Sequence, residues 1–340
     1  MATMEENIKE TPERIKGIVE ARKEIFKEVV KPEYTRVVIS GSGSSYHAGV
    51  GAQEFMLKYM QIPVEVLYPF QVEDYIFSEP ETTLFIGVSQ SGTSLSAYRA
   101  MKRAKEHGCR LASMSGRDDK AVVLNEVADD ILTVRCGEEG DLQPKTKGMI
   151  CTIVNLMMLG LEWGHAHGKI SEDTYENAVS ELVQTTDNMP VIIQDADTWI
   201  QKNGEISATA HDNRVVLATS LVAIVFAAIL ILVATLRVPV SGYEFEEFIH
   251  GIYNAINEDS VVILLDTGIE ERVPTMKKIL SQWSDYIIIS GQSAQDEIDF
   301  KVQSAKNADY SVLEYILWIF MICEKVSAMK GIDIQTTKDT

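Results

Sequence analysis

The sequence is poor in the residues that build metal centres and disulfide frameworks. Its 340 residues include only four cysteines, Cys109, Cys136, Cys151 and Cys323, and no two of them form a C-x-x-C pair. Such scattered cysteines are typical of small buried side chains in a reducing compartment. We therefore predict no metal site, no disulfide framework and a cytoplasmic location.

Positive charge is also scarce. The chain carries 31 lysines and arginines against 50 aspartates and glutamates, for a formal net charge of -19. This balance disfavours both nucleic acid and an anionic membrane surface as partners, although one local site can still bind a small anion. The charged N-terminus, residues 1–26, lacks the apolar core of a signal peptide, so export is not expected.

One long segment has no charge. The run from Val215 to Leu236 is long enough to span a bilayer. The competing interpretation is a buried strand, Arg214 to Ala218, followed by a helix that is buried on all sides. Because an α/β pattern continues on both sides with no second apolar span, we favour the buried interpretation and predict no membrane segment.

Short apolar strands alternate with helices along most of the chain, and the strands end in turns rich in Gly and Ser. This pattern predicts parallel sheets with helices on both faces. The pattern restarts after about residue 205, so we predict an α/β fold with two doubly wound αβα sandwich domains, flavodoxin-like, in tandem. The predicted parts are an N-terminal helix (1–30), a first domain (31–170), a helical bridge (171–205), a second domain (206–330) and a tail (331–340).

Two serine-rich turns carry the clearest chemical signal. The first serine loop (41–45, GSGSS) follows the first predicted strand, and the second serine loop (89–94, SQSGTS) follows the third. A turn between a parallel strand and a helix offers free backbone N–H groups and the positive end of the helix dipole, and hydroxyls add donors. Serine is also a common helix cap, so one loop alone is weak evidence. Two such loops beside one crevice indicate an anion site.

The stretch VVISGSGSSYHAG, followed about 45 residues later by FIGVSQSGTS, resembles the sugar isomerase (SIS) domain family. The two-domain length is similar to the isomerase half of glucosamine-6-phosphate synthase and to fructosamine-6-phosphate deglycases. The segment 144–148 (PKTKG) resembles the Thr-Lys segment that lines the same pocket in that family. The resemblance implies a phosphorylated sugar or amino sugar as substrate, no metal or organic cofactor, and six phosphate-binding residues: Ser44, Ser45, Ser89, Gln90, Ser91 and Ser94.

A third motif, EFEEFIHG, ends in a histidine at position 250. Histidine suits proton transfer during ring opening, although an exposed histidine beside acidic residues is equally compatible with the residues alone. The resemblance implies that His250 opens the sugar ring in a neighbouring subunit's site. It also implies that Glu247 orients this region, that Lys338 is the nearest match to a tail lysine of the site, and that the protein is a homo-oligomer (a dimer or larger) with shared active sites.

One position departs from the family. Its members place the glutamate that moves a proton between C1 and C2 sixteen residues before the histidine, and that position here is Ala234. The change admits a chain that binds without isomerising, or an altered or frame-shifted stretch of sequence. We therefore keep two functions. One is isomerisation, or preferably deglycation, of a fructosamine 6-phosphate. The other is a sugar-phosphate sensor or pseudoenzyme without the base.

Overall fold

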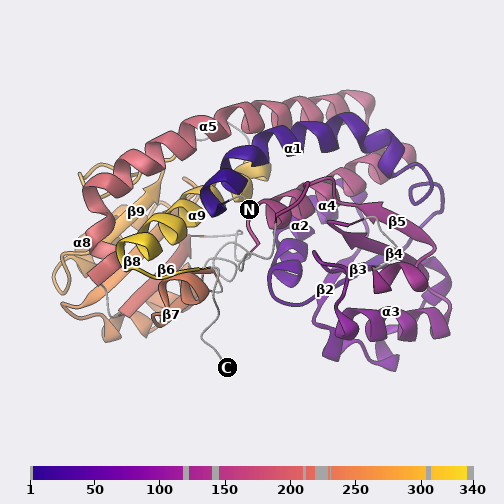
Figure 1. The fold of residues 1–340 in the computed structure, drawn as a ribbon, viewed down its shortest axis with the longest axis horizontal. Coiled ribbons are helices and arrows are strands. Elements are labelled where there is room, and N and C mark those ends of the chain that lie inside the picture. The colour runs from indigo at the N-terminus through magenta and orange to yellow at the C-terminus, as the bar shows by residue number, and fades with distance from the viewer. Residues whose placement is uncertain are drawn as a thin grey trace. The chain divides into compact units, whose positions relative to one another are not determined.

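Two compact units, each built on one parallel sheet, make up the chain (Figure 1). The N-terminal unit comprises Glu10–Gly140 with Lys145–Val183, and the C-terminal unit comprises Met1–Lys9, Asp141–Pro144 and Gln184–Thr340. The computed structural model describes residues 3–117, 122–139, 145–209, 212–218, 229, 231–303 and 308–334.

The N-terminal unit holds a five-stranded sheet in the order β2-β1-β3-β4-β5, in which every neighbouring pair is parallel. This is the flavodoxin-like order, whose ligand crevice lies where β1 and β3 diverge to opposite sides. The strands are β1 (Arg36–Ser40), β2 (Val64–Leu67), β3 (Thr83–Val88), β4 (Arg110–Ser115) and β5 (Asp130–Thr133).

Helices cover both faces of this sheet because the side chains of a strand alternate between its faces. Val38 and Phe85 pack with α3, whereas a Cβ placed on Gly49 of α2 would lie 3.1 Å from the Ile39 side chain. Ile39 therefore faces α2 and its neighbour Val38 faces α3. The helices with residues in this unit are α1 (Met4–Ile25), α2 (Ser44–Met60), α3 (Leu95–His107), α4 (Lys147–Ala166) and the start of α5 (Glu172–Thr209), and the 3-10 turns are η1 (Pro69–Gln71), η2 (Asp74–Ile76), η3 (Pro80–Thr82) and η4 (Val123–Glu126).

The C-terminal unit repeats the arrangement with four parallel strands in the order β7-β6-β8-β9. The predicted α/β class with two parallel sheets in tandem is therefore confirmed. The elements are β6 (Asp212–Ala218), β7 (Val240–Glu244), β8 (Ser260–Asp266), β9 (Ile287–Gly291), α7 (Phe245–Ile249), α8 (Val273–Leu280), α9 (Ser311–Met329), η5 (Ile252–Ala255) and η6 (Ala308–Tyr310).

The uncharged run at 215–236 contains the predicted strand, since β6 ends at Ala218. Residues 219–228 and 230 lie outside the described residues, and residues 231–236 are helical. The prediction of a helix buried on all sides is wrong for this end, because Val233 is 42% exposed and Ala234 is also exposed. Apolar composition alone did not distinguish a fully buried helix from one with an open face.

Among the described residues, one helix is long and apolar enough to cross a membrane by length and composition. It is α4, and 83% of its most apolar window is buried inside the protein. A core helix that packs on all sides gives the same signal.

Candidate functional site

The two serine loops leave the same edge of the N-terminal sheet. Strands β1 and β3 are parallel neighbours, with Ser40 opposite Gly87, so the chain turns away from both at their carboxyl ends. A Cβ placed on Gly41 would lie 3.1 Å from the Val88 carbonyl oxygen, so the loops touch where they begin. The structure therefore places both serine loops at the same edge of the sheet, and with them the six residues predicted for phosphate binding: Ser44, Ser45, Ser89, Gln90, Ser91 and Ser94.

Each serine loop leads directly into the N-terminus of a long helix. Helix α2 begins at Ser44 after Gly43, whose φ of 56° favours glycine. Helix α3 begins after Ser94, which caps it by accepting a hydrogen bond from the Ala97 N–H at 3.4 Å. The unpaired N–H groups of both helix ends give this edge a positive potential without a lysine or arginine in either loop.

Several hydroxyls at this edge remain able to bind a ligand. Within the part of the chain that the structure describes, the Ser44, Ser45 and Ser89 hydroxyls have no hydrogen-bond partner. Among the described residues, the Ser91 hydroxyl contacts only the hydroxyl and the N–H of Thr93. The Ser94 hydroxyl contacts only the Ser96 hydroxyl and the Ala97 N–H that it caps. Because hydroxyls rotate freely, these serines can turn their protons toward an anion.

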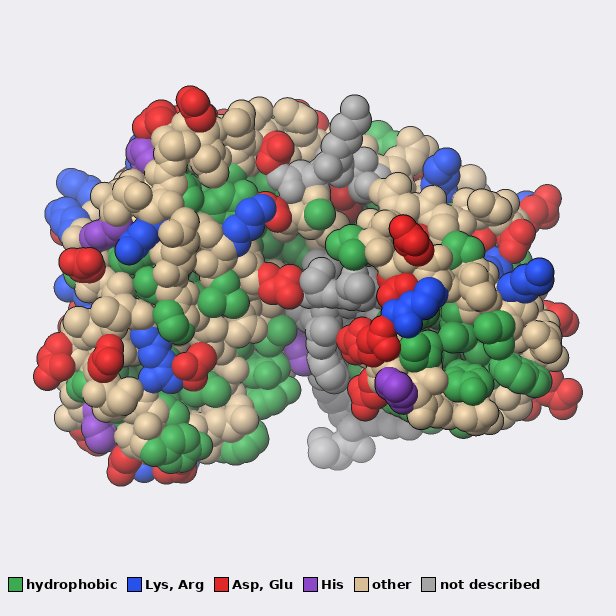
Figure 2. Space-filling view, turned by 180° about the vertical axis from the view of Figure 1, so that it is seen from behind, with side chains coloured by type: hydrophobic (Ala, Val, Ile, Leu, Met, Phe, Trp, Pro, Cys, Tyr) green, Lys and Arg blue, Asp and Glu red, His purple; other side chains and the backbone are tan. Residues whose placement is uncertain are grey.

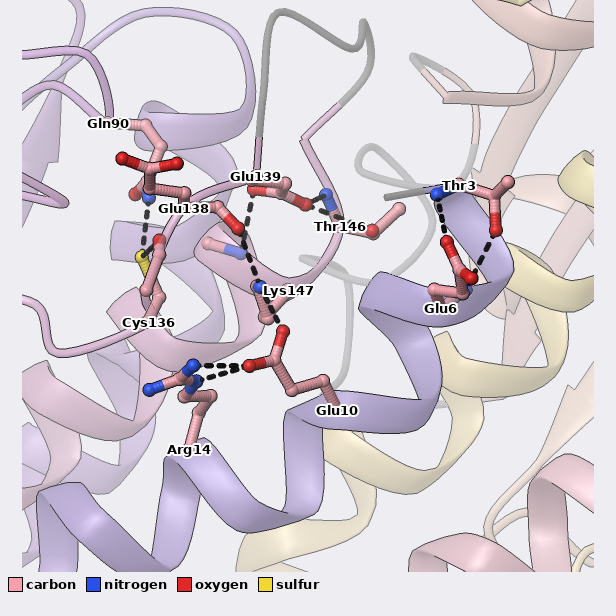
Figure 3. Close-up of polar contacts among 12 residues, drawn as sticks. Thr3, Glu6, Glu10, Arg14, Gln90, Cys136, Glu138, Glu139, Thr146 and Lys147 are labelled. Carbon is pink, nitrogen blue, oxygen red and sulfur yellow. Dashed lines mark hydrogen bonds and ion pairs between the residues drawn. The ribbon is translucent and has the colours of Figure 1, made fainter. Parts of the chain in front are cut away.

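The Gln90 side chain points away from this set. Its Nε2 donates a hydrogen bond to Cys136 Sγ at 3.0 Å (Figure 3), and its Oε1 accepts one from the Thr152 hydroxyl at 3.2 Å. What Gln90 offers on the loop is its backbone N–H, which contacts no described acceptor. The sequence grouped Gln90 with the serines, and it gave no signal for Cys136 or Thr152, which lie 46 and 62 residues further along the chain.

Lys147, in the segment that resembles the family's Thr-Lys segment, is fully buried and already paired. Its ammonium donates to the Glu10 carboxylate and, at 2.9 Å, to the Glu138 carbonyl (Figure 3). The hydrogen bond from Lys147 lowers the pKa of Glu10, which Arg14 also contacts. Lys147 therefore ties α1 to the start of α4 and contributes little free positive charge.

A carboxylate of the protein itself occupies the N-terminus of α4. The buried Glu139 carboxylate accepts hydrogen bonds from the Thr146 N–H at 2.6 Å, the Thr146 hydroxyl at 3.0 Å and the Gly148 N–H at 3.0 Å. A carboxylate in this position satisfies the orphan donors of the helix. In α4 the carboxylate that takes this position comes from Glu139 in the preceding segment, since α2, α3 and α4 all lack an acidic residue in their first turn.

The predicted catalytic residues lie on α7 in the C-terminal unit. His250 follows the last residue of α7 and is exposed, as is Glu247. The two other carboxylates of the motif are already engaged: Glu244 accepts from the Glu247 N–H at 3.1 Å and Glu246 pairs with Arg272. Lys338 lies outside the described residues.

Two further observations limit the chemistry. Within the described ranges no group of three His, Cys, Asp or Glu side chains could hold a metal ion. All four cysteines are buried free thiols.

The buried His47 should make the free energy of unfolding depend on pH in the acid range. Burial in the first turn of α2 lowers its pKa from 6.5 to about 4, so the folded protein keeps the ring neutral while the unfolded chain takes up a proton near pH 6.5. Protonation of the unfolded chain favours unfolding, so the free energy of unfolding should fall by up to about 3 kcal/mol between pH 6.5 and 4.

A His47→Gln variant should lose that part of the pH dependence. Urea unfolding of both proteins at several pH values between 7 and 4 measures the difference between them. If the free energies of unfolding of the two proteins changed equally with pH over this range, the loss of stability in acid would not come from His47.

Three comparisons relate the chain to known proteins. No family model matches it. The crystal structure of a candidate phosphosugar isomerase from Clostridium difficile 630 is 37% identical, covers 100% of this chain and 97% of that one, and superposes with a TM-score of 0.96. A candidate sugar-binding protein from Salmonella typhimurium LT2 is 34% identical over 93% of this chain and 97% of that one, with a TM-score of 0.84.

The curated relatives are longer proteins. Glutamine–fructose-6-phosphate aminotransferase (isomerizing) of Clostridium acetobutylicum is 23% identical over 314 residues, which are 89% of this chain and 50% of that protein. The chain thus spans about half the length of this curated relative. Because two solved relatives match at 37% and 34% identity over nearly their full length and share its fold, the chain belongs to the sugar isomerase (SIS) family of phosphosugar isomerases.

Proposed function

We propose that the chain binds a phosphorylated sugar through the two serine loops. One observation carries the proposal: two helix N-termini and the hydroxyls beside them meet at the switch point between β1 and β3. Charge-assisted hydrogen bonds from such donors suit a phosphate dianion. The relatives, whose names include a phosphosugar isomerase and a sugar-binding protein, support the same ligand class.

The surface charge agrees with a small anionic ligand rather than a polyanion. On the face seen in Figure 2, basic side chains are interspersed with acidic ones over most of the surface. A phosphate group can be held by local dipoles, whereas a nucleic acid needs an extended positive surface.

The reaction we propose is isomerisation, with deglycation of a fructosamine 6-phosphate as its specific form. His250 would open the sugar ring by proton transfer, and a base would move a proton between C1 and C2. Water would then add to the resulting C=N bond and release the amine and a sugar phosphate. We further propose a cytoplasmic homodimer in which each subunit contributes His250 to its neighbour's site, with Glu247 orienting His250 and Lys338 reaching the site from the tail.

A second candidate function is sugar-phosphate binding without isomerisation. The position expected for the base is Ala234, which has no proton to exchange. Glu244 and Glu246, the nearest carboxylates in the motif, serve as a helix cap and in an ion pair. These contacts favour a chain that retains the phosphate site and lacks an efficient base.

Restoring the base distinguishes the two candidates. With fructosamine 6-phosphate in heavy water, Ala234→Glu should raise the rate of deuterium incorporation at C1 by about 10²-fold or more, the usual contribution of a positioned general base. Proton NMR follows the exchange and the release of amine. Ala234→Gln, which matches the glutamate in size without its basicity, is the control.

The wild-type rate then assigns the function. Slow exchange in the wild type and in Ala234→Gln, with a gain only in Ala234→Glu, would support a binding protein of this family. Rapid exchange in all three proteins would show that another group is the base and that the chain is an active isomerase.

A further inference from the structure

We infer that Cys136 and Thr152 are positioning residues of the proposed phosphate site, because they hold the Gln90 side chain as an internal anchor for the second serine loop. The inference rests on the proposed function and adds residues that contact no ligand themselves. Gln90 lies between Ser89 and Ser91 in the sequence, so an anchor at Gln90 fixes the backbone of both serines.

The donors and acceptors around the Gln90 amide are matched. Gln90 Nε2 donates to Cys136 Sγ at 3.0 Å, and the thiol proton of Cys136 is directed at the Gly137 carbonyl at 3.3 Å, which leaves a sulfur lone pair for the amide. The Thr152 hydroxyl donates to Gln90 Oε1 at 3.2 Å and shares its proton with the Gly148 carbonyl at 2.7 Å. The thiol sulfur is a weak acceptor and the Thr152 proton is shared, so the two contacts hold the amide together rather than either one alone.

Two glycines provide the space that the amide fills. A Cβ on Gly116, just after β4, or on Gly148, in the first turn of α4, would lie 2.3 Å from Gln90 Nε2. Gly116 N–H also donates to the Gln90 carbonyl at 3.0 Å, so the backbone of this residue is held as well. Both Cys136 and Thr152 are buried. The anchor is thus enclosed by three separate segments of the N-terminal unit.

This enclosure leaves the other side of the loop free for a ligand. The backbone N–H groups of Gln90 and Ser91 contact no acceptor among the described residues, and the Ser89 hydroxyl is likewise unpaired there. Donors that are fixed before binding lose less conformational entropy when the anion arrives. Removing the anchor should therefore weaken phosphate binding even though every ligand-contacting group remains.

The test removes the hydrogen-bond acceptor at position 136 in one variant and provides a different acceptor there in a second. Cys136→Ala removes the sulfur and should weaken binding of fructosamine 6-phosphate by about 3- to 10-fold, the effect of one ordinary hydrogen bond. Cys136→Ser keeps an acceptor at this position and should bind within about twofold of the wild type. Cys323→Ala is the matched control, because Cys323 is equally buried but lies in α9 of the C-terminal unit.

Isothermal titration gives the dissociation constants, and thermal unfolding of each variant shows whether stability alone explains a loss. The inference is overturned if Cys136→Ala binds as tightly as the wild type, or if Cys136→Ser is as weak as Cys136→Ala at equal stability. If the wild-type protein bound neither the phosphosugar nor inorganic phosphate, the proposed function would be wrong, whatever the variants show. The anchor is then judged by hydrogen exchange of the Gln90 side-chain amide, which Cys136→Ala must accelerate and Cys136→Ser must not.

Discussion

Replacing Ser44 and Ser91 together with alanine is expected to weaken binding of a sugar phosphate by about 10²- to 10⁴-fold. Each hydroxyl donates to a charged group in the proposed complex, and such a bond contributes about 1.5–3 kcal/mol. The two residues come from different loops, at the start of α2 and just before α3. The double variant therefore removes one donor from each side of the site.

The matched control is the Ser42→Ala, Ser96→Ala double variant. Both serines are exposed and lie outside the six residues predicted for phosphate binding, two residues before Ser44 and five after Ser91. The Ser96 hydroxyl contacts the Ser94 hydroxyl at 3.1 Å, and the Ser94 hydroxyl can rotate toward a ligand without it. The control variant should bind the sugar phosphate within about threefold of the wild type. Equal losses in the two double variants would mean that the serines act through the stability of the loops and not through the ligand.

Gly164→Ala is expected to destabilise the N-terminal unit by about 3 kcal/mol, at the upper end of the cost of overpacking. Helix α4 crosses α2 closely at this point: a Cβ on Gly164 would lie 2.2 Å from the Tyr59 carbonyl oxygen and 3.0 Å from its carbon. Both atoms belong to the backbone, so the clash is relieved only by moving one helix. Because α2 begins at Ser44, phosphate binding should weaken as well.

Gly17→Ala in α1 provides the comparison for chemical denaturation. A Cβ at Gly17 meets no atom within 4 Å, so the variant should gain up to about 1 kcal/mol from the higher helix propensity of alanine. The two substitutions are chemically identical and should shift the urea midpoint in opposite directions. A Gly164→Ala protein as stable as the wild type would contradict the close crossing of α2 and α4.

Much of the fold follows from local patterns. The first serine loop follows a strand, β1 (Arg36–Ser40), as the sequence predicts, because a short apolar run that ends in a Gly/Ser turn is typical of a parallel strand. Parallel pairing followed from the alternation of strands and helices. The end of α5 was less predictable: the helix continues through polar residues to Thr209, past the expected bridge that ends at 205.

Some features of the candidate site follow from consecutive residues, and others depend on residues that are far apart in the sequence. The serine loops could be predicted because the strand, the turn and the helix that form the proposed anion site are consecutive in sequence. The direction of the Gln90 side chain could not, since it depends on a thiol and a hydroxyl on segments that only the tertiary fold brings near. The division of the chain into the predicted domain ranges remains a prediction.

The end of β8 in the second sheet differs from the end of β3 in the first, where the phosphate site is proposed. Asp266 ends β8, the strand that corresponds to β3 in the order of the sheet. Its carboxylate accepts hydrogen bonds at 2.8 Å from the N–H groups of Gly268 and Ser293. An anion placed there would meet a carboxylate that already uses the local donors, and this disfavours a phosphate site at the end of β8.

Calorimetric titration of the wild-type chain with fructosamine 6-phosphate, and in parallel with unphosphorylated fructosamine, tests the central claim most directly. We predict saturable binding of the phosphorylated sugar and, because the phosphate supplies most of the contacts, binding at least about 10²-fold weaker without it. Equal affinity for the two sugars would contradict a site built around phosphate at the ends of β1 and β3.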